Sequence, residues 1–148
     1  MGKYDHLFVR TPRPAELTHY KVPKDIRQSI AWMDSSTHPG SCSFEVIWYY
    51  KPLAGPPEHV HDDSCEILGY FGTNPEDPYD LGGEIKYYID GEEYTITQSC
   101  LIFLPKGLPH SPYEVVRVDR PILHFACLPE RPFSQLMKAP DLNEKKDK

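Results

Sequence analysis

The segment PPEHVHDDSCE, residues 56–66, places two histidines one residue apart and a glutamate five positions after the second. In a β-strand, residues i and i+2 point to the same face, so His59 and His61 can converge on one point. Glu66 has the opposite parity, but the turn-forming residues 62–64 can reverse the chain before it. This spacing predicts that Glu66 begins the next strand and faces back toward the two imidazoles.

A further histidine follows in the segment LPKGLPH, residues 104–110. This segment is predicted to end a strand, turn at Gly107 and present His110. Three neutral imidazoles and one carboxylate suit a divalent first-row metal such as Fe, Mn, Ni, Zn, Co or Cu. In an octahedral site, four protein ligands leave two neighbouring positions for water, O₂ or a substrate. The predicted metal ligands are His59, His61, Glu66 and His110.

Composition describes one globular domain. The chain has 148 residues, of which 39% are hydrophobic and 12% aromatic, which is enough to bury a core without a metal or a disulfide. Its net charge of -6 argues against nucleic acid and anionic membranes as partners, because both require a basic surface. No apolar run is long enough to span a bilayer, and the start, MGKYDHLFVR, has no apolar leader. We therefore expect a cytoplasmic protein with free cysteines.

The predicted fold class is all-β. Sixteen prolines and nine glycines separate short segments that are rich in Val, Ile, Tyr and Phe. Asp90-Gly91 is a strong signal for a two-residue hairpin loop. Several of the predicted strands are apolar on both faces, which favours two packed sheets or a closed barrel. The clearest strand candidates are residues 41–50, 65–71, 83–90, 92–97, 99–105 and 120–128.

The distribution of apolar, turn-forming and charged residues divides the chain into three parts. Residues 1–25 are predicted to form an N-terminal arm, residues 26–135 a β-barrel domain, and residues 136–148 a charged, flexible tail. The acidic, turn-rich segment 72–81 either shapes a rim or subunit contact, or is a solvated loop.

Taken together, the two motifs resemble those of the cupin superfamily. HVHDDSCE matches the pattern H-x-H-x₄-E, and PKGLPH, from Pro105 to His110, matches P-x-G-x₂-H. The chain departs from the family pattern in both motifs. In the first, Gly55 lies too close to His59 and Thr73 stands in place of the closing glycine. In the second, Ser99 stands in place of a glycine and Glu114 in place of an asparagine. The resemblance implies a single-domain jelly-roll β-barrel with a metal near one mouth. Together with the apolar strand faces, it also suggests a homodimer.

Four other residues are candidates for supporting roles. His124, within the predicted strand 120–128, is either a catalytic acid, base or donor beside the metal, or a buried structural histidine. Trp48 and Tyr50 are candidate substrate-binding residues, although aromatic side chains on a strand also build cores. Lys106 is a candidate substrate contact at a loop tip, or a solvated lysine.

Two functions are compatible with these motifs. The first is a metalloenzyme, of dioxygenase, isomerase, decarboxylase or lyase type, that acts on a small and partly aromatic or carbonyl-containing molecule. The second is a metal-containing small-molecule-binding or sensor module without turnover. The sequence does not choose between them, and it names neither the metal nor the substrate, because fold alone does not determine chemistry.

Overall fold

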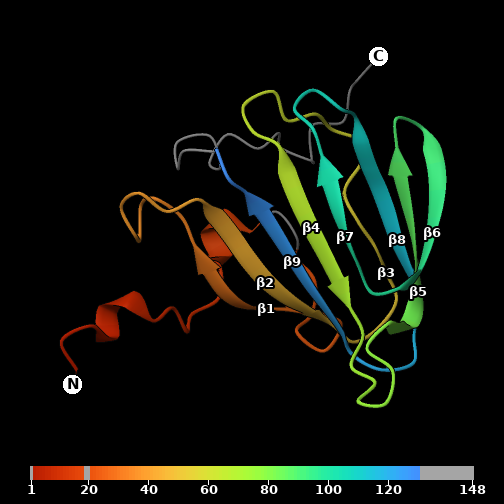
Figure 1. Ribbon diagram of the computed structural model, residues 1–148, viewed down its shortest axis with the longest axis horizontal. Helices are drawn as coiled ribbons and strands as arrows, with labels where there is room; N and C mark the ends of the chain where they lie inside the picture. The colour runs from red at the N-terminus through yellow and green to blue at the C-terminus, as the bar shows by residue number, and fades with distance from the viewer. Residues whose placement is uncertain (1, 19–20, 131–148) are drawn as a thin grey trace.

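Residues 2–18 and 21–130 are described by the structure, a computed structural model. Two antiparallel sheets face each other, one with strand order β1-β2-β9-β4-β7 and the other with order β3-β8-β5-β6 (Figure 1). This architecture confirms the all-β class. The strands are β1 (Arg27–Met33), β2 (Ser43–Tyr49), β3 (Leu53–Ala54), β4 (Glu66–Phe71), β5 (Asp80–Ile89), β6 (Glu92–Gln98), β7 (Cys100–Leu104), β8 (His110–Val118) and β9 (Ile122–Leu128).

Six of these strands were predicted, and three were not. Asp90 and Gly91 form the expected hairpin loop between β5 and β6, and both have the positive φ that such a loop requires. The unpredicted strands are β1, β3 and β8. In β8, Pro112 weakens the strand pattern, because proline cannot donate to a ladder. In β1, only Trp32 is buried, so the apolar alternation is weak.

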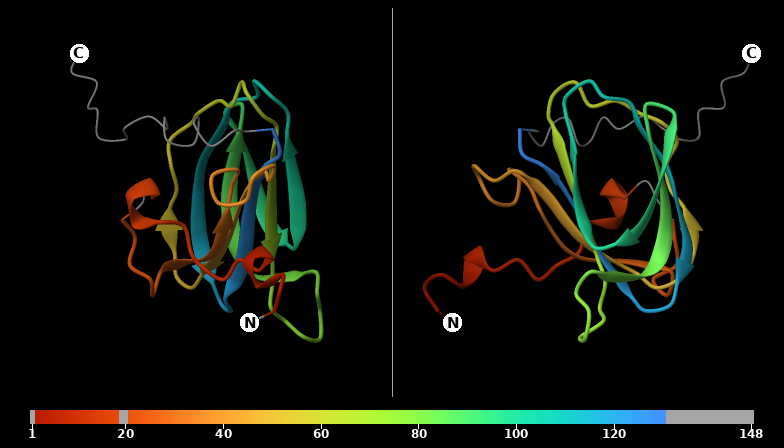
Figure 2. Two further views of the ribbon diagram at one scale, coloured as in Figure 1. Left: turned by 90° about the vertical axis from the view of Figure 1, so that its left-hand side faces the viewer. Right: turned by 45° about the vertical axis from the view of Figure 1, so that its right-hand side comes forward.

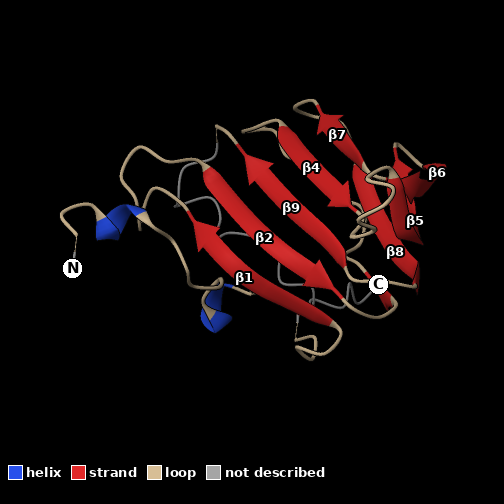
Figure 3. Cartoon of the chain, turned by 60° about the horizontal axis from the view of Figure 1, so that its bottom comes forward, coloured by secondary structure: helices blue, strands red, loops and turns tan. Residues whose placement is uncertain are grey.

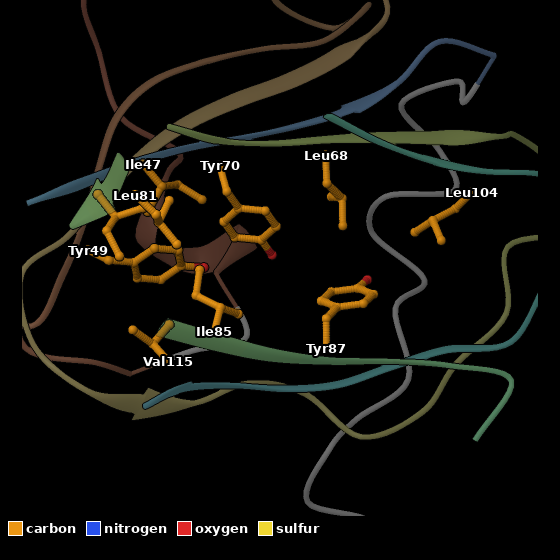
Figure 4. Packing of buried hydrophobic residues seen from close by; sticks show 10 residues of the cluster. Ile47, Tyr49, Leu68, Tyr70, Leu81, Ile85, Tyr87, Leu104 and Val115 are labelled. Carbon is orange, nitrogen blue, oxygen red and sulfur yellow. The ribbon is translucent and has the colours of Figure 1, made fainter. Parts of the chain in front are cut away.

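Seen end-on, the two sheets enclose an open barrel, and the five-stranded sheet forms one broad layer (Figures 2 and 3). Apolar side chains from both sheets meet between them. Three tyrosines from three strands, Tyr49, Tyr70 and Tyr87, also point inward and are almost fully buried (Figure 4). The rest of the cluster consists of Ile47, Leu68, Leu81, Ile85, Leu104, Val115 and Ile122.

Strand β2 carries its polar residues and most of its apolar residues on different faces. Its buried side chains are Ser43, Glu45, Ile47 and Tyr49, so the residues between them lie on the outer face. Trp48 is one of these, and Tyr50 follows the strand and donates a hydrogen bond from its hydroxyl to Gln28 Oε1. Substrate binding by Trp48 and Tyr50 stays a prediction. The outer face of β2 is the more apolar one, because the barrel interior itself contains polar groups.

Part of the predicted N-terminal arm packs on the barrel. It contains two short 3₁₀ helices, η1 (Asp5–Leu7) and η2 (Ala15–Leu17). Thr11 accepts a backbone hydrogen bond from Trp32 of β1, and Leu17 packs beside Trp32 and Leu128. The division of the chain into arm, barrel and tail stays a prediction, and the tail 136–148 lies outside the described residues.

The outer face of the five-stranded sheet is apolar. Leu101 and Phe103 on β7 are 62% and 64% exposed. Phe125 stacks on Phe44 and on Phe71 across the neighbouring strands. The homodimer stays a prediction. Within residues 2–18 and 21–130, no helix has the length and apolar character needed to cross a membrane.

Candidate metal centre

The three histidines and the glutamate of the two motifs lie together at one end of the barrel. His59 and His61 belong to the segment between β3 and β4, Glu66 is the first residue of β4, and His110 is the first residue of β8. One donor atom from each of the four side chains lies within 4.8 Å of all the others. The predicted reversal at residues 62–64 and the predicted convergence are thus both present.

Backbone pairing holds these segments in place. His59 and His110 form an isolated antiparallel bridge with two hydrogen bonds, of 3.0 and 3.1 Å, between their main chains. The carbonyl of His61 accepts a hydrogen bond from the amide of Gly107, which turns the chain with φ near 78°. Glu66 pairs with Leu104 across β4 and β7. The ligand geometry is therefore fixed by main-chain contacts as well as by side chains.

The distances suit coordination of one ion. Oε2 of Glu66 lies 3.0 Å from Nε2 of His61 and 3.1 Å from Nε2 of His110. Ring centroids of His59 and His110 are 4.5 Å apart. Donor atoms about 2.1 Å from a shared ion stand ~3.0 Å apart at right angles and ~4.2 Å apart across it. The cluster is close to this spacing.

Two of the imidazoles have a defined orientation. Nδ1 of His59 lies 2.9 Å from the carbonyl oxygen of Pro57, and Nδ1 of His110 lies 2.9 Å from that of Leu108. A carbonyl oxygen only accepts, so each Nδ1 carries the proton and donates it. The neutral ring of His110 therefore turns the lone pair of Nε2 toward Glu66 Oε2, which lies 3.1 Å away, and the ring of His59 leaves its Nε2 free to serve as the donor atom in the same group. This outward anchoring is typical of metal-ligating histidines.

The pKa shifts of Glu66 and His110 show that the cluster stabilises positive charge next to this carboxylate. Burial opposes ionisation of Glu66, but the contacts of its carboxylate with His110 and His61, which are favourable when a proton lies between them, outweigh burial and lower the pKa of Glu66 to about 2. Burial alone would lower the pKa of His110, yet contacts with Glu66 and the Leu108 carbonyl raise it. Burial lowers the pKa of His59. A carboxylate that faces imidazole lone pairs is stabilised by a proton or a metal ion between them. This donor set can hold a divalent transition metal.

His124 lies in the barrel interior but is not part of this cluster. It is 5% exposed, and its Nδ1 lies 2.8 Å from the carbonyl oxygen of Gly69. Its ring stacks on Tyr70 at 4.4 Å and on Tyr49 at 5.4 Å. Burial lowers the pKa of His124 to about 4, so the ring is neutral near pH 7. These contacts agree with a buried structural histidine, and a catalytic role stays a prediction.

Lys106 extends from the loop before β8 into solvent. Its ammonium group lies 3.1 Å from a carboxylate oxygen of Glu130, and both side chains are about half exposed. An exposed ion pair of this kind contributes little to stability. The structure therefore gives Lys106 a surface partner, and its role as a substrate contact stays a prediction.

A cavity of about 340 Å³ lies between the two sheets along β5, β6 and β7. It is close to the cluster, because Ile89 of its lining pairs with His110 across β5 and β8. A volume of this order suits a small organic ligand. The lining consists of Tyr87, Ile89, Tyr94, Thr95, Ile96, Thr97, Gln98, Cys100 and Ile102.

Sequence reasoning missed the interior tyrosines. Tyr87 is 2% exposed, lines the cavity and shares a hydrogen bond with Ser111, the residue after His110. Tyr70 is 1% exposed beside His124. The period-2 alternation of β5 was a usable signal, since Leu81, Ile85 and Tyr87 fall on one face of that strand. For Tyr70, the glycine at position 69 interrupts that signal.

Comparison with known proteins supports the fold. No family model matches the chain, and no curated protein sequence matches it. A structure described as a predicted oxalate decarboxylase from Thermotoga maritima aligns with a TM-score of 0.51 and 13% identity, over 71% of this chain and 79% of that one. A sugar phosphate isomerase of the cupin superfamily from Silicibacter pomeroyi aligns with a TM-score of 0.51 and 16% identity, over 73% and 62%.

A third similar structure is a recombinant oxalate oxidase in complex with glycolate, with a TM-score of 0.51 and 16% identity over 86% of this chain and 62% of that one. The chain thus spans less than two thirds of two of these three proteins. At such identities, the likeness concerns the arrangement of strands and not the chemistry. The two facing antiparallel sheets and these alignments together show that the chain has the jelly-roll β-barrel fold of the cupin superfamily.

Proposed function

We propose that this protein is a metal-dependent enzyme that acts on a small organic molecule inside the barrel. One observation carries the proposal. The buried carboxylate of Glu66 meets Nε2 of His110, whose Nδ1 is held by a carbonyl. Donor atoms of His59 and His61 lie within 4.8 Å of it, an arrangement suited to a cation between the donors.

The chain's own groups provide a site for holding and orienting a substrate. His59, His61, Glu66 and His110 would hold the ion. A divalent metal bound there would polarise an oxygen atom of the substrate or bind O₂ next to it. The adjacent cavity is lined mainly by isoleucine and tyrosine, so it favours a compact, partly apolar or aromatic molecule over a polymer. Tyr87 lines this cavity, and its hydroxyl is the group that could orient a polar substituent.

The identity of the active metal and the consumption of O₂ distinguish a dioxygenase from an isomerase, decarboxylase or lyase. We would load metal-free protein separately with Fe(II), Mn(II), Ni(II) and Zn(II) under anaerobic, reducing conditions and measure stoichiometry by elemental analysis. Each form would then be mixed with small hydroxy and keto acids and phenols while O₂ uptake and product formation are followed.

The outcomes discriminate between the hypotheses. Substrate-dependent O₂ consumption by the iron form selects an oxygenase. Turnover by the manganese, nickel or zinc form without O₂ uptake selects an isomerase, decarboxylase or lyase. Ligand binding by the metal-loaded protein with no turnover of any candidate favours the binding or sensor module instead. Failure to bind any of the four ions at one equivalent would sink the proposal.

A further inference from the structure

His124 is held in one tautomer inside the barrel. It lies on β9 in register with Ile47 of β2 and Tyr70 of β4, whose side chains are both buried between the sheets. Its Nδ1 faces the carbonyl oxygen of Gly69 at 2.8 Å, and a carbonyl can only accept. Nδ1 therefore carries the proton. The other ring nitrogen, Nε2, presents a lone pair and can act only as an acceptor.

The ring has little freedom to turn. Tyr70 stacks on it with a centroid distance of 4.4 Å and an interplanar angle of 19°, and Tyr49 stacks on it at 5.4 Å and 28°. Rotation of the ring would break the hydrogen bond to Gly69 and both stacking contacts. The lone pair of Nε2 therefore has a fixed direction.

Nε2 has no hydrogen-bond partner within residues 2–18 and 21–130. In this part of the chain, four side-chain nitrogen or oxygen atoms are both sealed from solvent and without a hydrogen bond. Nε2 of His124 is not one of them, so it borders open space inside the barrel. The hydroxyl of Tyr70 meets the same two conditions.

Tyr70, which stacks on His124, faces the cavity-lining residue Tyr87 across the barrel interior (Figure 4). The hydroxyls of Tyr70 and Tyr87 point into the same interior region from opposite sheets (Figure 4). Tyr87 lines the cavity, and so does Cys100, the strand partner of Tyr70. The carboxylate of Glu66 acts electrostatically on Tyr70, Tyr87 and His124 alike. A small molecule at the metal centre could therefore reach this region.

We infer that Nε2 of His124 and the hydroxyl of Tyr70 form a recognition site for a hydroxyl group of the substrate. The inference rests on the proposed function, since it places the hydroxyl on the molecule that the metal centre would bind. The substrate hydroxyl donates to Nε2, and the Tyr70 hydroxyl can donate to the substrate oxygen in return. A buried acceptor without a partner discriminates strongly against an analogue that lacks the donor.

A matched pair of probes tests this recognition. Phenol can donate a hydrogen bond, whereas its methyl ether, anisole, cannot. With zinc-loaded protein, we expect phenol to bind about tenfold more tightly than anisole, which is the size of one net hydrogen bond. Imidazole ¹⁵N NMR should show an unprotonated Nε2 on His124, and its resonance should move on addition of phenol and stay in place with anisole.

Two variants serve as matched tests. His124→Phe keeps a ring between Tyr49 and Tyr70 but removes both nitrogens, so the preference for phenol should fall below about twofold. Tyr70→Phe should reduce the preference by a smaller factor. Zinc content and thermal melting of each variant verify that the metal centre and the fold are intact, and the NMR result on the unmodified protein does not depend on the variants.

Each result decides a separate point. A preference for phenol that survives His124→Phe, or a protonated Nε2 in the unmodified protein, would overturn the inference. Failure of the unmodified protein to hold zinc would overturn the proposed function instead. The phenol and anisole comparison on the same metal-free samples would then still decide the role of His124, because Nε2 does not depend on the metal for its orientation.

Discussion

Two buried carboxylates in this molecule have opposite surroundings. Glu45, on β2, lies 3.7 Å from a guanidinium nitrogen of Arg13 and 3.7 Å from one of Arg27, and its other oxygen accepts a hydrogen bond from Ser29 Oγ. Glu66, on β4, is about equally buried, but its close partners in the described residues are imidazoles. One carboxylate meets permanent cations and the other does not.

The difference separates a structural site from a functional one. A guanidinium is positive at every accessible pH, so the chain itself compensates the charge of Glu45. An imidazole is neutral above its pKa, so the charge of Glu66 is compensated only when a proton or a metal ion joins the cluster. The ion pair between Glu45 and Arg13 also connects the N-terminal segment to the barrel. The cluster at Glu66, in contrast, can bind a cation.

The largest expected effect is on metal affinity. Replacing His110 by Ala removes one of four donors and should weaken zinc binding about 100- to 1,000-fold, because a quarter of the ~10–16 kcal/mol that a four-ligand zinc site supplies is about 3 kcal/mol. Replacing Glu45 by Gln should leave zinc affinity unchanged, because Glu45 is not a donor in the cluster. Competition with a chromophoric chelator measures both variants.

Equal zinc affinity in the unmodified protein and in His110→Ala would contradict the ligand assignment. A loss of similar size in Glu45→Gln would show that the two carboxylates are not independent, and the contrast between them would fail. Circular dichroism of both variants verifies that the barrel is folded.

Two histidines, one beside Glu66 and one without a carboxylate partner, have pKa values shifted in opposite directions. Glu66 raises the pKa of His110, whereas burial without a carboxylate partner lowers the pKa of His124 from 6.5 to about 4. Above pH 6.5 neither the folded nor the unfolded state protonates His124. As pH falls from 6.5 to 4, the unfolded state gains a proton that the folded state excludes. This difference lowers the free energy of unfolding by about 3 kcal/mol across the window.

Urea unfolding of metal-free protein at several pH values tests this sign. The stability advantage of the unmodified protein over His124→Phe should shrink by about 3 kcal/mol from pH 7 to pH 4, because the variant has lost the excluded proton. The carboxylates and the other histidines contribute equally to both proteins. A gap that stays constant, or that widens as pH falls, would contradict the burial of a neutral His124.

A smaller effect is expected for the compensated carboxylate. Glu45→Gln leaves Arg13 and Arg27 beside a neutral amide, and it should cost about 2 kcal/mol, below the usual range for a broken buried pair because these side chains stay 10–18% exposed. The free energy of unfolding in urea measures the cost. Glu76→Gln, at an exposed loop position, is the matched control and should have no effect.

Much of the fold and the cluster follows from local sequence signals. The parity of His59 and His61, the turn before Glu66 and the Asp90-Gly91 loop each specify backbone geometry within a few residues. The strands that the sequence pattern did not predict are those whose formation depends on contacts with distant parts of the chain. One is β8, in which His110 begins a strand with proline at its third position. Glu66 and His110 begin strands, and His59 and His61 lie in the short segment just before β4, so local geometry places all four donors.

The interior surface could not be predicted in the same way. Alternation in β2 separates two faces correctly, but it does not say which face is inside, and the more apolar face with Trp48 lies outside. The inner face carries Glu45, whose neutralisation by Arg13 and Arg27 depends on contacts with distant segments. Buried polar networks of this kind depend on partners far away in sequence, so composition and period say little about them.

The smallest expected effect concerns a third carboxylate, which has a cation partner but no burial. Glu130 pairs with Lys106 at 3.1 Å in solvent, and its pKa is lowered chiefly by the hydrogen bond from Lys106. Water already stabilises both charges, so Lys106→Ala should leave the melting temperature and the zinc affinity within error of the unmodified protein. A clear loss of zinc affinity would connect the loop at Lys106 to the metal cluster. The conclusion that burial distinguishes Glu45 and Glu66 from an exposed, ion-paired carboxylate such as Glu130 would then be wrong.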